Sequence, residues 1–194
     1  MMFFIADMHL GHFNILKYCN RPFASIEEMD QTLIDNWNNK ISNNDIVYHI
    51  GDFCFRNPEY YLTQLNGKKH IILGDHDKQI QNNSKKLAII HREMILKFSI
   101  KLNDENVSIN LCHWCMRVWP KSHYNSWLLF GHSHGRLYPR GKSWDVGVDN
   151  NSFSPLSLED ISKIMFTRPA NFNCINKSVE RDIDEDEQIY IENN

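Results

Sequence analysis

The chain has 194 residues, of which 42% are hydrophobic, and its formal net charge is −3 at pH 7. This length and composition predict one compact domain with a sizeable core. The slightly negative charge argues against a protein that coats nucleic acid through a general excess of basic residues, although a local positive patch is compatible with it. We therefore expect small or locally recognised partners and no general binding to nucleic acid.

The first apolar run, Met1 to Ala6, is only as long as a strand and has no basic leader, so it predicts neither a signal peptide nor a membrane anchor. The five cysteines are an odd number without the spacing of a disulfide framework. Cys112 and Cys115 form one C-x-x-C pair without a second, which favours unpaired thiols over a zinc or redox motif. These features predict a cytoplasmic protein with reduced thiols.

The first half of the chain alternates strand-like and helix-like segments. Short apolar runs at residues 3–6, 46–50 and 71–73 predict strands. Ser25 and Glu28 have the spacing of a capping box, and apolar residues at helical spacing continue to Ile41. Pro58 begins a second helix, and Gly67 is a natural stop. This order is typical of an α/β fold.

The second half changes character. Residues 95–102 and 107–111 alternate in polarity around a turn at 103–106, which predicts a hairpin and hence a mixed sheet. A strand at 127–130 and a helix from Ser157 to about Met165 follow. The remaining residues include a charge-rich block, so we expect a domain at 1–167 and an acidic, flexible tail at 168–194.

Carboxylates and imidazoles follow the predicted strands at the points where these strands end. The carboxyl ends of strands in an open α/β sheet converge on one crevice, so these side chains should lie close together. Two divalent ions need a bridging carboxylate, several imidazoles and an open edge for substrate. The candidate residues are Asp7, His9, Asp52, Asp75, His76, Asp77, His113, His132 and His134.

This ordered set, D-x-H, G-D, G-D-H-D, H and G-H-x-H, resembles the calcineurin-like metallophosphoesterases over roughly residues 1 to 166. The strings at 20–23, 65–70 and 145–149 are similar to those of a small single-domain branch found in bacteria and phages. The resemblance implies a four-layer αββα sandwich of two mixed β-sheets flanked by helices, the fold of metallo-dependent phosphatases.

The resemblance also implies a role for each candidate. The first metal would be held by Asp7, His9 and His134, the second by Asp75, His113 and His132, and both by Asp52. The implied reaction is hydrolysis of a P–O bond in a small phosphoester or a nucleotide-like phosphodiester by metal-bound hydroxide. His76 would be the general acid, with Asp77 orienting its ring or fixing another nearby donor. Manganese is the expected metal, and iron, zinc or nickel would also suit these ligands.

Contacts to substrate are harder to assign. Arginines suit phosphate, but most arginines are ordinary surface charges. The candidates near the predicted site are His12, Arg21, Arg56, Arg117 and Arg136. Aromatic residues around His113 could stack a nucleobase or belong to the core, and these are Trp114, Trp119, Tyr124 and Trp127.

Asp75 departs from the family pattern, which ordinarily has asparagine there. An ionised aspartate has no NH₂ to offer to phosphate and adds a negative charge. The replacement could inactivate the enzyme, tune it toward less charged phosphodiesters, or be neutral. A catalytically weakened or inactive binding or scaffold module of the same fold is therefore the alternative to a phosphoesterase. A repair nuclease is a third possibility, but a long basic groove is not evident.

Overall fold

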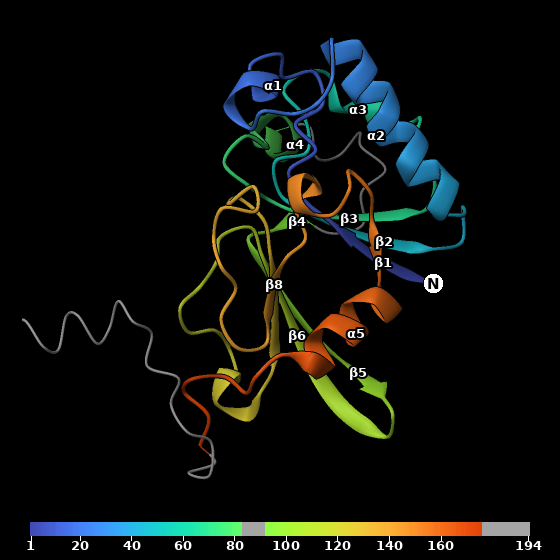
Figure 1. Ribbon diagram of the computed structural model, residues 1–194. Helices are drawn as coiled ribbons and strands as arrows, with labels where there is room; N and C mark the ends of the chain where they lie inside the picture. Colours follow the sequence, from blue (N-terminus) through green and yellow to red (C-terminus); the bar gives the residue numbers. More distant parts are fainter. Residues whose placement is uncertain (83–91, 176–194) are drawn as a thin grey trace, which may run out of the picture.

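The computed structural model describes residues 1–82 and 92–175. These residues form a mixed α/β fold with two β-sheets (Figure 1). The first sheet has the strand order β4-β3-β2-β1-β9, and the second has the order β5-β6-β7-β8. Both sheets combine parallel and antiparallel pairs, which confirms the predicted mixed pairing.

The first sheet is built mainly from parallel strands. Strand β1 pairs with β2, β2 with β3 and β3 with β4 in parallel, whereas β9 runs antiparallel to β1. The parallel arrangement places the carboxyl ends of β1, β2 and β3 at one edge, as the sequence predicted. The strands are β1 (Met2–Ile5), β2 (Ile46–Ile50), β3 (Lys68–Ile72), β4 (Arg92–Glu93) and β9 (Leu156–Ser157).

The second sheet contains the predicted hairpin. Its turn is tight, because Leu102 pairs with Glu105 and the two residues between them, Asn103 and Asp104, both have positive φ angles. Such turns suit asparagine and aspartate, which tolerate the left-handed region. The strands are β5 (Ile95–Leu102), β6 (Glu105–Cys112), β7 (Trp127–Phe130) and β8 (Ser143–Asp145).

The helices are short except for two. Ser25 caps the longest helix by accepting a hydrogen bond from the backbone N–H of Glu28, and Ser157 with Asp160 forms a complete capping box at the last one. The bounds are α1 (Ile15–Tyr18), α2 (Ile26–Lys40), α3 (Pro58–Leu62), α4 (Lys78–Asn82) and α5 (Leu158–Thr167), with 3₁₀ helices at η1 (Ser122–Tyr124) and η2 (Val148–Asn150).

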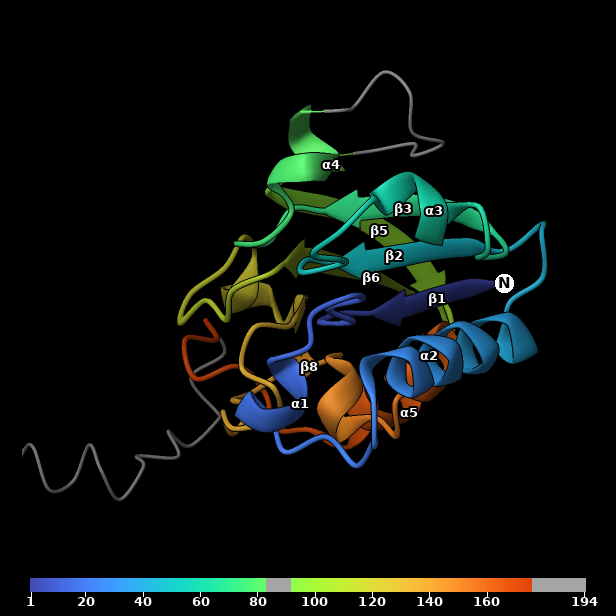
Figure 2. The same cartoon turned by 90° about the horizontal axis from the view of Figure 1, so that it is seen from above.

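The two sheets pack face to face. Phe4 and Ile50 of the first sheet share one buried cluster with Ile109 and Leu129 of the second. Helix α2 covers the opposite face of the first sheet, where its Trp37 is fully buried (Figure 2). Burial on both faces stabilises the first sheet and holds the edge where its strands end.

The segment that follows β6 covers the part of the second sheet's outer face formed by β7 and the end of β6. Trp119 of this segment is buried against Leu128 and Phe130. Trp127 is also buried, between the sheets. Trp119 and Trp127 are therefore core residues, which is the second of the two roles left open for them by the sequence.

The predicted boundary between the domain and the flexible tail, at residue 168, lies too close to the N-terminus. Asn171 is buried, and its side-chain amide donates hydrogen bonds to the carbonyls of Ser122 and Ser126. Arg168 donates to the carbonyl of Gly141. Residues 168–175 thus pack on the domain, because buried polar partners fix them, while residues 176–194 lie outside the described residues. Within 1–82 and 92–175, no helix has the length and apolar character needed to cross a membrane.

Candidate metal centre

The predicted ligands lie in loops at the carboxyl ends of β1, β2, β3, β6 and β7. Many of these residues have a left-handed backbone conformation. The φ angle lies between 49° and 66° for Asp7, His9, Asp52, His132 and His134. Left-handed backbone is unfavourable for non-glycine residues and persists where the surrounding structure enforces it, commonly at functional sites. The ligand loops are therefore conformationally constrained.

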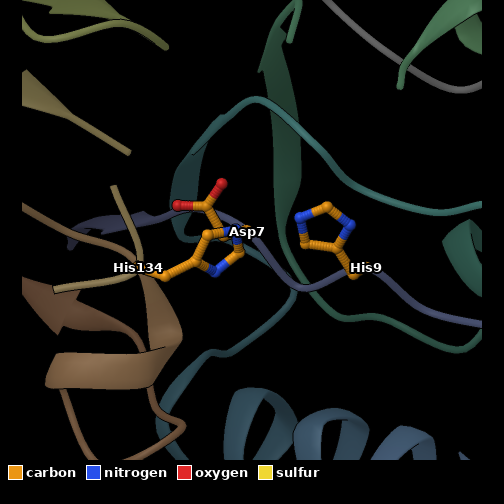
Figure 3. Close-up of side chains that lie close together, drawn as sticks. All are labelled: Asp7, His9 and His134. Carbon is orange, nitrogen blue, oxygen red and sulfur yellow. The ribbon is translucent and has the colours of Figure 1, made fainter. Parts of the chain in front are cut away.

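One set of ligands, the His134 group, consists of Asp7, His9 and His134. Each residue offers one ligand atom, and the three atoms lie within 4.8 Å of one another. Figure 3 shows the three side chains directed toward a common space. Asp7 and His9 are almost fully buried. The prediction that the loops after β1 and β7 meet is confirmed.

A second set, the His132 group, consists of Asp75, His113 and His132, whose ligand atoms also lie within 4.8 Å of one another. Its exposure differs from that of the first set, because the side chains of Asp75 and His132 are 46% and 52% exposed. Asp75 Oδ2 lies 3.3 Å from His132 Nδ1 and accepts a hydrogen bond from the indole N–H of Trp114.

Asp52 lies between the two groups. Its Oδ2 atom is 3.5 Å from Nε2 of His9 and 3.5 Å from Nε2 of His113. Its other oxygen accepts a hydrogen bond from the backbone N–H of His76. A single carboxylate oxygen thus faces one imidazole from each group.

Several buried nitrogen atoms of this cluster have no hydrogen-bond partner among the described residues. They include both ring nitrogens of His9 and Nε2 of His113. Nδ1 of His113 lies 2.9 Å from the carbonyl of Ile50, so Nδ1 donates a hydrogen and Nε2 keeps its lone pair when the ring is neutral. Unpaired buried polar atoms are costly, and a cation among them would remove that cost.

Residues outside the two groups orient the ligand side chains through hydrogen bonds. Nδ1 of His134 is 2.7 Å from Asp149, which leaves Nε2 of His134 for a metal. Asp149 also accepts two hydrogen bonds from Arg21. The remaining N–H groups of Arg21 reach Met29 and the backbone carbonyls of Asp7 and Met8. Asp149 and Arg21 together therefore connect the loop after β1 to the loop after β7.

Arg21 was predicted to contact substrate, and the structure corrects this prediction. Its side chain is buried and its guanidinium donors are already used within the protein. Sequence reasoning noted the string 145–149 but gave Asp149 no role. Asp145 was missed in the same way, although it accepts hydrogen bonds from Ser133 and from the backbone of Gly135, and so shapes the loop that carries His134.

Burial and charge perturb these groups strongly. Burial raises the pKa of Asp7 to about 7 against the opposing imidazoles of His113 and His134. Burial lowers the pKa of His9 to about 2. Burial would also lower the pKa of His113, but Asp52 and Asp7 outweigh it and raise that pKa to about 9. The cluster thus favours a positive charge beside its carboxylates, which either a proton or a cation can supply.

Glycines allow the close approach of these loops. A Cβ atom on Gly51, whose φ is +85°, would lie 2.3 Å from Nδ1 of His113. A Cβ atom on Gly131 would lie 2.6 Å from Oδ2 of Asp7. Steric crowding therefore excludes a side chain at the positions before Asp52 and before His132, where the sequence has glycine.

His76 and Asp77 differ in position. His76 is 45% exposed, and its Nε2 is 3.9 Å from Asp52 Oδ2. Asp77 is buried, and its carboxylate accepts hydrogen bonds from the backbone N–H groups of Asp52, Phe53 and Gly74. Asp77 thus fixes the loops around Asp52, and these three hydrogen bonds do not involve the ring of His76.

The other candidate substrate residues are spread around the site. His12 stacks on Phe55, with ring centroids 3.7 Å apart, and burial lowers its pKa. Arg56 and Arg117 are exposed, in the segments after Asp52 and after His113. Arg136 donates to the carbonyl of Tyr18. Phe55 was not predicted, and no pattern in the sequence marked it.

Comparison with known proteins places the chain among uncharacterised relatives. It is 32% identical over 182 residues to the uncharacterized protein MJ1445 of Methanocaldococcus jannaschii, covering 84% of this chain and 90% of that protein. The chain therefore belongs to the same family as MJ1445. The gene 66 protein of Mycobacterium phage L5 is 30% identical over 80 residues, 38% of each chain.

The fold has a solved counterpart. The protein of unknown function AQ665 from Aquifex aeolicus matches with a TM-score of 0.62 and 20% identity, covering 84% of this chain and 98% of that one. At this identity, the likeness shows the fold alone. No family model matches the sequence.

Proposed function

We propose that this chain is a dinuclear metal-dependent phosphoesterase that hydrolyses a P–O bond in a small phosphoester or a nucleotide-like phosphodiester. The observation that carries the proposal is the position of Asp52, with one oxygen 3.5 Å from Nε2 of both His9 and His113. A carboxylate shared between two ligand groups is what a two-metal site requires. The two facing sheets, with α2 outside the first, are compatible with the αββα sandwich of metallo-dependent phosphatases.

The donor set fits divalent metals. The His134 group and the His132 group each supply a carboxylate and two imidazoles, and Asp52 can serve both. Manganese, iron, zinc and nickel all accept these donors, and we expect manganese. When bound, such ions would stabilise negative charge on phosphate oxygens and lower the pKa of nearby water.

His76 is suited to donate a proton to the leaving oxygen. It is half exposed and stands beside Asp52 without belonging to either ligand group. The backbone N–H of His76 donates to Asp52, which fixes its main chain relative to the cluster. Asp77 maintains this arrangement through its hydrogen bonds to Asp52 and Gly74.

Asp75 should shift the substrate preference toward diesters. With Asp7, Asp52 and Asp75 ionised, two divalent ions would leave a net charge of about +1 on these groups, whereas an asparagine at position 75 would leave about +2. The lower positive charge should weaken the binding of a phosphomonoester dianion more than the binding of a diester monoanion. The partial exposure of Asp75 puts its charge where substrate can approach.

The test combines metal content with hydrolysis. Protein stripped by chelation and reloaded with manganese should bind about two ions per chain and hydrolyse a diester from a matched monoester and diester panel. Two bound ions without hydrolysis of any ester would favour the alternative of a binding or scaffold module. Absence of metal binding would contradict the phosphoesterase.

A further inference from the structure

The rings around His76 form a continuous aromatic wall on one side of the metal centre. Phe55 lies 4.6 Å from His76 and 3.7 Å from His12, measured between ring centroids. Tyr18 meets the edge of His12 at 6.2 Å. The wall, defined as His76, Phe55, His12 and Tyr18, therefore runs from Asp52 toward the protein surface.

The wall is exposed at both ends, at His76, whose side chain is 45% exposed, and at Tyr18. Phe55 and His12 are half-buried, whereas Tyr18 is 60% exposed and neighbouring Phe13 is 68% exposed. The main chain of Tyr18 is held in place, because its carbonyl accepts a hydrogen bond from Arg136. Exposed aromatic rings on a fixed segment beside a reactive site are suited to contact a ligand.

We propose that this wall is the subsite for the leaving group and that it takes an alcohol carrying a flat ring, such as a nucleoside or an aryl alcohol. The inference rests on the proposed function, because a general acid must stand next to the leaving oxygen and His76 is that acid. The leaving group then lies along the rings that continue from His76. Flat rings stack on aromatic side chains, and stacking tolerates different bases.

The aromatic residues after His113 do not offer an equivalent surface. Trp119 and Trp127 are buried in the core. Trp114 donates its N–H to Asp75, in the His132 group, and so lies on that side of the centre. Tyr124 is exposed but belongs to η1, where it lines a cavity of about 750 Å³ with Ser108 and Trp127 at the second sheet.

The decisive comparison uses two pairs of phosphate monoesters, and only one member of each pair carries a flat aromatic ring. AMP and ribose 5-phosphate share the same leaving oxygen, and benzyl phosphate and cyclohexylmethyl phosphate form a second pair that differs in the flat ring. Affinity is measured by calorimetry on the zinc-loaded full chain, and kcat/KM on the manganese-loaded one. AMP should bind about tenfold more tightly than ribose 5-phosphate, within the range of one stacked base.

Four variants locate the effect. Tyr18→Ala should remove most of the preference for AMP, and Tyr18→Phe should retain it because the ring remains. Tyr124→Ala serves as the control at another exposed tyrosine. Phe55→Leu, which replaces the flat ring nearest His76, should also weaken the preference. A preference limited to AMP would mean that the subsite accepts a nucleoside as leaving group. A preference shared by benzyl phosphate would mean that it accepts any flat ring.

The two proposals fail in different ways. Hydrolysis of the panel with equal affinity for AMP and ribose 5-phosphate would overturn the subsite and leave the phosphoesterase intact. A preference for AMP that Tyr18→Ala abolishes, without hydrolysis of any ester, would support the ring subsite and contradict the phosphoesterase. A preference that Tyr18→Ala and Phe55→Leu both leave unchanged would overturn the wall as its cause.

Discussion

The two ligand groups are supported very differently. In the His134 group, His134 bonds to Asp149, Asp149 bonds to Arg21, and Arg21 holds the carbonyl of Asp7, all with little solvent exposure. In the His132 group, Asp75 and His132 are about half exposed, and Asp75 is held by Trp114. Buried hydrogen-bonded partners fix ligands more firmly than exposed ones do.

From this contrast we expect the two groups to differ in metal affinity and in access for substrate. The His134 group should bind its ion tightly in a preformed cage. The His132 group should bind its ion more weakly and leave room for substrate to approach. Four substitutions test this comparison, beginning with the largest expected effect.

Asp52→Ala should remove both ions, because the carboxylate between the groups is the one ligand that they share. Elemental analysis after reloading with manganese checks this outcome. Asp104→Ala, at the exposed turn of the β5–β6 hairpin, is the matched control and should keep full metal content. Full metal content in Asp52→Ala would mean that each group binds independently.

Arg21→Gln should destabilise the protein by roughly 3–5 kcal/mol, because it leaves Asp149 buried without its charged partner. Urea unfolding measures the change. Arg56→Gln, at an exposed arginine, should cost less than about 0.5 kcal/mol. Equal stability of the two variants would contradict the supporting role of Arg21. The loss of metal should be greater for the His134 group than for the His132 group.

His76→Ala should retain its metal and lose about 10²-fold or more in kcat for esters with alkyl leaving groups. The loss should be smaller for a nitrophenyl ester, whose leaving group needs little protonation. An equal loss for both esters would count against His76 as the general acid. His123→Ala, at a histidine on η1 away from the ligand groups, is the control.

Asp75→Asn should raise the ratio of monoester to diester kcat/KM by roughly tenfold at most, since one negative charge is removed where phosphate approaches. Binding of the second ion should weaken slightly at the same time. Asp35→Asn, on the exposed side of α2, should leave the ratio unchanged. An unchanged or lower ratio in Asp75→Asn would show that the charge of Asp75 does not set the preference.

Much of the fold could be predicted from local patterns. The strands β1, β2 and β7, the hairpin and the helices α2 and α5 follow from apolar periodicity and capping residues, which act over a few neighbouring positions. Strand β8 (Ser143–Asp145) and strand β9 (Leu156–Ser157) were not predicted. They are too short to show an alternation of apolar and polar residues. Each is a strand because it pairs with a neighbouring strand, not because of its own residues.

The sequence by itself indicated which side chains could meet at the centre, because residues that directly follow the parallel strands of one sheet lie at the same edge of that sheet. The packing of the two sheets then brings the histidines that follow β6 and β7 to the edge where β1, β2 and β3 end. Only the tertiary structure decided how they are held. Arg21 and Asp149 are 128 positions apart, and their buried ion pair depends on the packing of the segment between α1 and α2 against η2. Periodicity reports local burial, whereas such a contact exists only after distant segments have packed together.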